Sequence, residues 1–278
     1  MSDKLVLKGI SKTFTGEKGS QIAALQSIDL TIKDQEFVSM VGPSGCGKST
    51  LIYLIAGFDQ PSGGEIYVNG KRVQSPGSDR GVVFQKVTSF PWLTVLENIG
   101  FGLKILGVGD EERRKLSMEY LELTGLRGFE NEYPAGLSGG MQQRVALARS
   151  LVTNPEILLM DEPFAALDSQ TRRFMQDLLV DIWEKTRKTI LFVTHDVDEA
   201  LLIADRVLVM SSRPGIIMDD IKVDLPRPRT FKVEFSQEYI ELKKRVQNQI
   251  NSEAMKTLSD PDARLIERHY QETDGAGE

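Results

Sequence analysis

The stretch from Gly42 to Thr50 constrains this chain more than any other part of it. It reads Gly-Pro-Ser-Gly-Cys-Gly-Lys-Ser-Thr and fits the pattern G-x-x-x-x-G-K-[ST]. An apolar run typical of a buried strand, residues 36–41, precedes it, and a run typical of a helix, residues 51–56, follows it. A strand, a glycine-rich loop and a helix in this order predict a phosphate-binding loop. An ordinary glycine-rich turn is the alternative, but it would not require both flanking elements.

The residue types of this loop suit a polyphosphate ligand. Glycines at three positions let the backbone curl with its N–H groups facing inward, and the helix that follows adds the positive end of its dipole. Lys48 supplies a point charge for the terminal phosphates, and the Ser49 hydroxyl can be a ligand of Mg²⁺. We therefore expect the following residues to bind the ligand: Gly42, Pro43, Ser44, Gly45, Cys46, Gly47, Lys48, Ser49 and Thr50.

Composition limits where such a chain can work. With 278 residues it can form one large domain or two modest ones, and its net charge of −6 gives no general attraction to nucleic acid. No apolar run is long enough to span a bilayer, and the N-terminus lacks the apolar core of a secretion signal. One cysteine excludes an internal disulfide, which favours a reducing cytoplasm. Any work at a membrane would therefore depend on a partner.

The hydrophobic pattern indicates an α/β protein interrupted by a helical region. Strand-like runs and helical runs alternate from residue 157 to residue 210, which predicts a mostly parallel sheet with both faces covered. Between them, residues 94–106, 110–124 and 139–151 all have helical spacing, without an intervening strand. Pro226-Arg-Pro-Arg229 then resembles a linker, and a further helical pattern follows at residues 239–250.

A pair of acids ends the strand predicted at residues 157–160. Asp161 and Glu162 directly follow four apolar residues, and burying such a pair is costly unless a cation lies nearby. With a phosphate-binding loop in the same sheet, that cation is Mg²⁺, held by Asp161. Glu162 would then orient and polarise the attacking water. A strand end that merely carries two surface acids is the alternative.

A third motif lies between the other two. Leu137-Ser-Gly-Gly-Met-Gln-Gln-Arg144 places a serine and two glycines directly before a helix, where their N–H groups form a second anion site. Here the chain resembles the ATP-binding cassette (ABC) ATPases, whose signature begins Leu-Ser-Gly-Gly. The resemblance implies that Ser138, Gly139 and Gly140 bind the γ-phosphate of an ATP molecule held by another subunit, so that two copies sandwich two nucleotides.

The same resemblance assigns further residues. Gln85 matches the glutamine that contacts Mg²⁺, Asp168 lies in the loop that communicates across the dimer, and His195 matches the histidine that donates to the γ-phosphate. Phe14 matches the aromatic residue that stacks on adenine; tyrosine is commoner there, but phenylalanine keeps the ring face. At position 141 the chain has methionine where glutamine is commoner in the family. Phosphate binding does not require that side chain. The catalytic set is thus Lys48, Gln85, Glu162 and His195, and the Mg²⁺ ligands are Ser49, Gln85 and Asp161.

The resemblance also implies a fold and a domain organisation. The expected class is α/β, with a P-loop NTPase (RecA-like) core, an antiparallel β subdomain and an inserted α-helical subdomain. We expect the ATPase domain to span residues 1–225, with the helical insertion at about 90–150, and a C-terminal helical extension to span residues 226–278.

Several stretches resemble one branch of this family, the bacterial importers of the nitrate/sulfonate/taurine type. They are residues 79–85, 90–95, 133–141 and 207–211 together with Arg213-Pro-Gly215. The branch implies two ATPase subunits, identical or closely related, beneath an integral membrane permease that receives solute from a binding protein. The chain would then be peripheral, on the cytoplasmic face of the bacterial inner membrane. Residues 87–92, which include Pro91 and Trp92, are either the permease-docking segment or a loop that packs on the core.

Two other functions are alternatives to import, and one further prediction concerns the reactivity of Cys46. A non-transport ABC-type scaffold or assembly ATPase would share all these motifs. An ABC-type ATPase of DNA maintenance would need a long coiled-coil insertion and a basic stripe, and the sequence has neither. Cys46 lies in the phosphate-binding loop, where N–H groups and Lys48 would lower its pKa if it were exposed, so that thiol reagents would inhibit the protein and ATP would protect it. The alternative is that Cys46 is a small buried filler residue.

Overall fold

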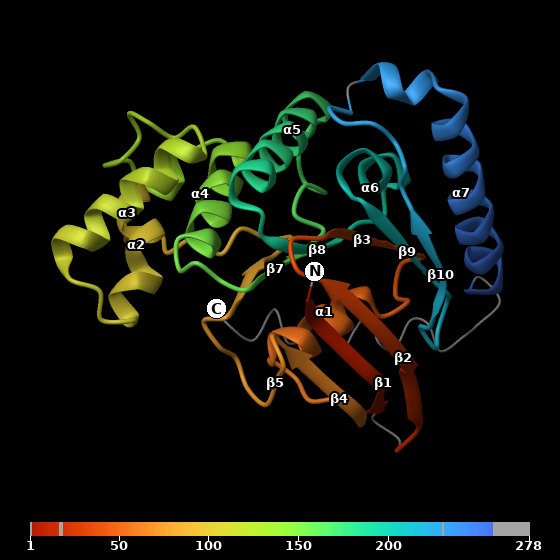
Figure 1. Cartoon of the computed structure of the whole chain (residues 1–278). Helices are drawn as coiled ribbons and strands as arrows, with labels where there is room; N and C mark the ends of the chain where they lie inside the picture. Colours follow the sequence, from red (N-terminus) through yellow and green to blue (C-terminus); the bar gives the residue numbers. More distant parts are fainter. Residues whose placement is uncertain (1, 17–18, 230, 258–278) are drawn as a thin grey trace.

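The computed structural model describes residues 2–16, 19–229 and 231–257. Two sheets and a helical lobe make up the molecule (Figure 1). The larger sheet has the order β10-β9-β3-β8-β7-β6, in which β10 is antiparallel to β9 and the other neighbours are parallel. The smaller sheet is antiparallel, with the order β2-β1-β4-β5. The predicted fold class is therefore confirmed.

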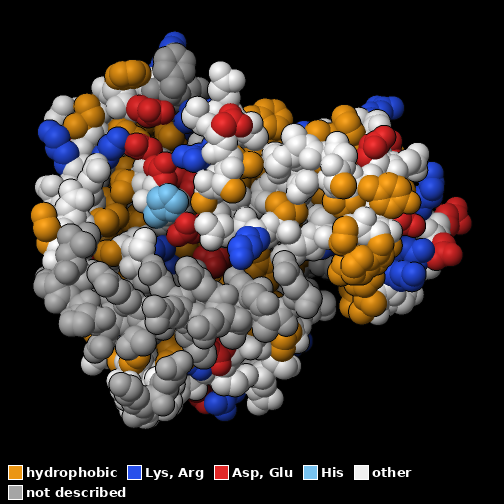
Figure 2. Space-filling model, turned by 180° about the vertical axis from the view of Figure 1, so that it is seen from behind, with side chains coloured by type: hydrophobic (Ala, Val, Ile, Leu, Met, Phe, Trp, Pro, Cys, Tyr) orange, Lys and Arg blue, Asp and Glu red, His pale blue; other side chains and the backbone are white. Residues whose placement is uncertain are grey.

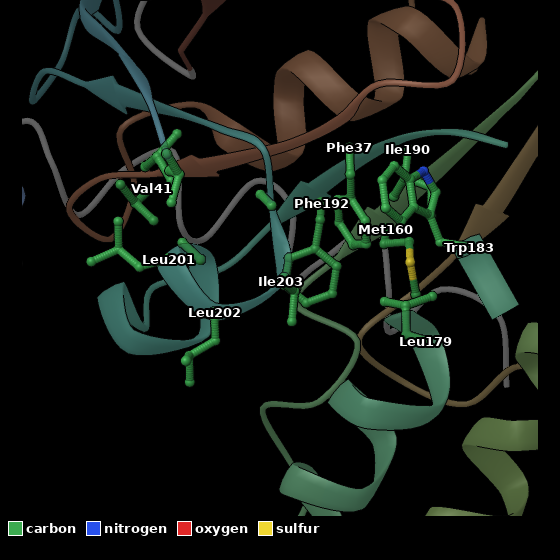
Figure 3. Packing of buried hydrophobic residues seen from close by; sticks show 14 of the residues in the cluster. Phe37, Val41, Met160, Leu179, Trp183, Ile190, Phe192, Leu201, Leu202 and Ile203 are labelled. Atoms are coloured by element: carbon green, nitrogen blue, oxygen red, sulfur yellow. The ribbon is translucent and has the colours of Figure 1, made fainter. Parts of the chain in front are cut away.

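The parallel strands are short and apolar because they are buried on both faces. Every residue is buried in β3 (Phe37–Val41), β7 (Ile157–Asp161) and β8 (Thr189–Val193). The sheet is completed by β6 (Arg80–Val83), β9 (Arg206–Met210) and β10 (Ile217–Lys222). Helix α1 (Lys48–Ala56) shares one core with the smaller sheet, and α5 (Ser169–Thr186) and α6 (Val197–Ile203) cover the opposite face of the large sheet. Figure 3 shows Phe37, Met160, Trp183 and Phe192 packed together in this second core.

The smaller sheet consists of β1 (Asp3–Thr15), β2 (Gln21–Lys33), β4 (Gly63–Val68) and β5 (Lys71–Arg72). The first two strands form a long hairpin, whereas the only strand-like apolar runs in this part of the sequence are short, at residues 5–7 and 28–32. Register shifts interrupt their pairing at several points, so the alternation of apolar and polar residues is lost and the pattern fails to predict their length.

The inserted helical lobe matches the prediction closely. It contains α2 (Val95–Ile105), α3 (Asp110–Leu123) and α4 (Gly139–Leu151), with a 3₁₀ turn at Pro134–Gly136. Thr94 begins α2 with a capping box: its hydroxyl accepts from the Glu97 N–H, and the Glu97 carboxylate accepts from the Thr94 N–H. The three helices share a small core of their own, which includes Ile99, Leu121 and Val145.

The C-terminal part of the described chain packs on the body. A 3₁₀ turn (Phe231–Phe235) leads into α7 (Gln237–Thr257), which places Tyr239 and Val246 in the core beside α6. The linker predicted at Pro226–Arg229 is instead firmly docked, because the buried Arg229 guanidinium donates to the carbonyls of Leu201, Ala204, Val223 and Leu225. The division of the chain at residue 225 remains a prediction, and residues 258–278 of the expected extension lie outside the described part.

Candidate active site

The chemically important residues converge because parallel strands end at one edge of the sheet. Strand β3 leads into the phosphate-binding loop, and β6 leads to Gln85. Strand β7 ends at Asp161, which pairs in register with Val193 at the end of β8, two residues before His195. Residues that lie more than a hundred positions apart in the chain therefore meet at this edge.

The phosphate-binding loop has the predicted backbone. Gly45 and Gly47 have φ angles of 71° and 103°, in the left-handed region that favours glycine. A Cβ atom at Gly47 would also lie 2.6 Å from the Leu25 side chain. The Lys48 side chain is buried inside the loop, where its Nζ donates to the carbonyl oxygens of Gly42 (2.9 Å) and Pro43 (3.0 Å). The ammonium group is thus fixed at the floor of the loop.

A cavity of about 680 Å³ lies over this edge of the sheet. It has the size of a small-molecule site. The lining residues include half of the predicted site residues: Ser44, Gly45, Gly47, Lys48, Ser49, Thr50, Gln85, Asp161 and Glu162. The phosphate-binding loop and the acid pair therefore face one space, and its polar wall combines three basic residues, two acids and the N-terminal end of α1.

Asp161 occupies the deepest acidic position of the site. Its Oδ1 accepts a hydrogen bond from the Ser49 hydroxyl at 3.0 Å. Burial is the main cause that raises its pKa from the ordinary value of 3.8 to about 6, and the nearby Glu162 carboxylate raises it further, against the Ser49 bond and the Lys48 charge. The ionised form is therefore poorly solvated. A hydroxyl, a carboxylate and the Gln85 amide in one cavity are the oxygen ligands that Mg²⁺ prefers.

We expect Asp161→Asn to stabilise the protein when nucleotide and divalent cations are absent. The folded protein keeps the Asp161 proton up to about pH 6, whereas the unfolded chain loses it near 3.8, so stability falls as pH rises through this window. Asparagine removes that cost, and the melting temperature should rise by roughly 2–4 °C at pH 8, by less at pH 5 and not at all below about pH 3.8, where both states are protonated. Asp168→Asn is the control, because the Thr171 hydroxyl lowers the pKa of that carboxyl. An equal rise in both variants would contradict the assignment of the cost to Asp161.

Glu162 and His195 form a direct pair. The His195 Nδ1 lies 2.9 Å from the Glu162 Oε2, and the histidine side chain is more than half exposed. Glu162 has a φ of 44°, which is unfavourable for a residue with a side chain, and its N–H donates to the Val193 carbonyl at 2.9 Å. Strand β8 therefore fixes the backbone that aims this carboxylate at the cavity.

The remaining predicted residues lie elsewhere in the described part of the chain. Ser138 is the N-cap of α4, where its Oγ accepts from the Met141 N–H, and Gly139 and Gly140 form the first turn. Asp168 is the N-cap of α5. Phe14 lies on β1, with the Lys12 ammonium 5.1 Å from its ring centroid. None of these five residues is among the described residues that line the cavity.

The condition for a reactive thiol at Cys46 is not met. The side chain is buried, and this burial raises the thiol pKa despite the opposing charge of Lys48. The predicted inhibition by thiol reagents is therefore not expected for the folded protein. Cys46 instead fills space beneath the loop.

Several cavity residues had no predicted role, and Arg213 is one of them. Arg213 lines the cavity, and its Nη2 donates to the Gly45 carbonyl at 3.0 Å. It follows β9, which ends at the same edge of the sheet as the other site strands. That position in the strand order could have marked Arg213 as a site residue.

Comparisons with known proteins agree with this geometry. The model of the ABC transporter family matches residues 25–165. An uncharacterised ABC transporter ATP-binding protein of Methanocaldococcus jannaschii is 48% identical, over 93% of this chain and 95% of its own length. A nitrate import ATP-binding protein of Synechocystis sp. is also 48% identical (84% and 90% covered), and a taurine import ATP-binding protein of Rhizobium johnstonii is 50% identical (77% and 82% covered).

Solved structures lead to the same family. A dimeric ATP-binding cassette in a post-hydrolysis state, bound to ADP and phosphate, is 38% identical to this chain. It superimposes with a TM-score of 0.69 and covers 80% of this chain and 100% of its own. The fold and the sequence relatives thus point to the same family. This chain belongs to the ABC transporter family, as one of its ATP-binding and ATP-hydrolysing subunits.

Proposed function

We propose that this chain powers the import of a small oxyanion through a membrane permease. The solute class would be nitrate, a sulfonate such as taurine, or bicarbonate, because relatives that import nitrate and taurine match most of this chain. A bicarbonate transport ATP-binding protein of Synechococcus elongatus is also 47% identical, although this chain covers only 35% of that longer protein. The observation that carries the proposal is the convergence of Lys48, Asp161 and Glu162 on one cavity in a chain of this family.

Two copies of the chain would be needed for hydrolysis. The signature residues Ser138–Gly140 do not line the cavity that is lined by Lys48, Asp161 and Glu162. They form an N-terminal helix end with free donor capacity for an anion. In the proposed dimer, the signature of one copy faces the γ-phosphate held by the other, with Asp168 beside the contact. The dimeric state of the related cassette supports this arrangement.

Each group of the cavity then has a defined task. Ser49, Gln85 and Asp161 would hold Mg²⁺, which neutralises phosphate charge when it is bound. Lys48 and the N–H groups of the loop bind the β- and γ-phosphates. Glu162 accepts a proton from the attacking water and orients it, and His195 donates to the γ-phosphate from the ring edge opposite its bond to Glu162. Phe14 would stack on adenine.

The segment after Gln85 is proposed as the permease-docking surface. Arg149 ties it down by donating to the Thr88 carbonyl (2.6 Å) and hydroxyl (2.6 Å), and the Phe90 N–H donates to Asn98. Trp92 nevertheless remains 70% exposed. Figure 2 shows further hydrophobic side chains on the surface of the helical lobe, at the right of the view. A fixed segment with an exposed aromatic residue suits a helix of a permease.

Among the described residues, no helix is long and apolar enough to cross a bilayer. The proposed permease partner places the chain at the cytoplasmic face of the membrane. Nucleic acid is not a proposed partner.

Purification of the tagged chain from gently solubilised membranes tests the proposal. An integral permease should co-purify, and the complex in liposomes should hydrolyse ATP faster when the cognate binding protein is supplied with nitrate, taurine or bicarbonate. Substitution of Trp92 by alanine should reduce recovery of the permease. Recovery of soluble partners alone, without an integral protein, would favour the scaffold or assembly ATPase instead.

A further inference from the structure

The turn after β9 is built against the phosphate-binding loop. Every other parallel strand of the large sheet ends at a residue already placed at the site, and β9 ends near Arg213. Arg213 donates to the Gly45 carbonyl at 3.0 Å, while the N–H at the other end of that peptide unit, on Cys46, donates to the Pro43 carbonyl at 3.3 Å. This peptide unit is therefore held from both sides, and with it the left-handed conformation of Gly45.

The same turn is fixed on its other side by Gly215. The Gly215 N–H donates to the Ala24 carbonyl at 2.8 Å, and its own carbonyl accepts from the Gln26 N–H at 3.0 Å. A Cβ atom at this position would lie 2.2 Å from the Cys46 carbonyl oxygen, so the backbone of the turn lies directly against the loop. A shift of the turn would therefore move the phosphate-binding loop.

A buried carboxylate on α7 holds this turn. The Glu253 side chain is buried, and its Oε2 accepts from both the N–H (2.8 Å) and the hydroxyl (2.9 Å) of Ser212. Burying a carboxylate is costly unless it is well hydrogen-bonded, and bonds to an ionised acceptor are strong. Glu253 belongs to the last turns of a helix that has no proposed part in hydrolysis, and its partner directly precedes Arg213.

We infer that Glu253 is a positioning residue of the nucleotide site, which holds the turn at Ser212 so that Arg213 fixes the phosphate-binding loop for ATP. The inference rests on the proposed placement of ATP in this cavity. The C-terminal helix then contributes to nucleotide affinity and not only to packing. The catalytic residues Glu162 and His195 follow other strands, β7 and β8, so the chemical step should be little affected.

The test is nucleotide binding by the full-length chain, measured with a fluorescent ATP analogue, together with steady-state hydrolysis. Glu253→Ala should raise the Kd and the KM for ATP roughly tenfold, as expected for lost hydrogen bonds to a charged group. The kcat should stay within about twofold of the value for the unaltered chain. The lost interaction stabilises bound ATP and the transition state equally, so its loss raises KM and not the barrier from the bound state. Glu253→Gln keeps an acceptor and should restore most of the affinity. Arg213→Ala should match Glu253→Ala, and the double variant should be no worse than either.

Arg245→Ala is the matched control. This residue lies on the same helix and forms a two-pronged ion pair with Asp219 on β10, away from the cavity. It should lower the melting temperature without changing the Kd for ATP. If Glu253→Ala lowers the melting temperature but leaves the Kd unchanged, Glu253 only docks the helix and the inference is overturned. Failure of the unaltered chain to bind the analogue would instead overturn the proposed nucleotide site.

Discussion

Glu162→Gln should bind ATP as well as the unaltered chain but hydrolyse it about 10²–10⁴-fold more slowly, the usual contribution of a general base. Glutamine has nearly the same size and keeps an acceptor for His195, yet it cannot take a proton from water at neutral pH. Because hydrolysis is what reopens the proposed dimer, the variant should accumulate as a closed dimer. Size-exclusion chromatography in the presence of ATP would detect it, alongside phosphate release.

The control for this variant is Glu156→Gln, the same substitution just before the opposite end of strand β7. Glu156 bonds to Lys4 there, far along the strand from the cavity. Its loss should leave turnover and oligomeric state unchanged. Normal turnover in Glu162→Gln would mean that another group activates the water, and the proposed mechanism would be wrong.

The backbone at Glu162 explains why this position is more than a strand end with a surface acid. A left-handed conformation at a residue with a side chain costs about 1–3 kcal/mol and is kept only where the surroundings enforce it. Here the bond to the Val193 carbonyl enforces it. The strained backbone of Glu162 and the buried carboxylate of Asp161 both lower the stability of this edge of the sheet. Both costs are consistent with a site that binds a cation and phosphate.

Much of the active site was predictable because its residues follow apolar runs. Strands β3, β7 and β8 are buried on both faces, so each reads as a short apolar segment, and polar residues at their ends stand out. The phosphate-binding loop is continuous in sequence and carries its own pattern. The helical lobe was predictable as well, since α2 begins with a complete capping box and its helices have uninterrupted spacing.

What could not be predicted depends on contacts between distant segments. Strand β10 carries Asp219 and Asp220, which resemble loop residues until their partners Arg245 and Arg206 are known. Arg229 looks like part of a linker because prolines surround it, whereas its burial depends on carbonyl groups of α6 and its neighbours. Burial of Cys46 could not be predicted either, since its residue type and neighbours fit both an accessible thiol and a buried filler residue.

Lys48→Ala should reduce the affinity for ATP by at least about 100-fold. A loss of this size corresponds to two charge-assisted hydrogen bonds to phosphate. The Lys48 ammonium is buried at the floor of the loop, so no water can replace its interaction with phosphate at similar strength. Its present partners, the carbonyls of Gly42 and Pro43, already hold it at the correct depth. Binding of the fluorescent ATP analogue and phosphate release should both fall to background at micromolar nucleotide.

Lys86→Ala separates this effect from a general loss of positive charge. Lys86 lines the same cavity, but its side chain is exposed, so its contribution is screened by solvent. Its removal should weaken ATP binding by less than about fivefold, in keeping with an exposed ion pair. The melting temperature of nucleotide-free Lys48→Ala must remain close to that of the unaltered chain for the comparison to hold. Equal losses in the two variants would mean that ATP is attracted by the charge of the cavity as a whole, and that the buried lysine does not have the specific part assigned to it.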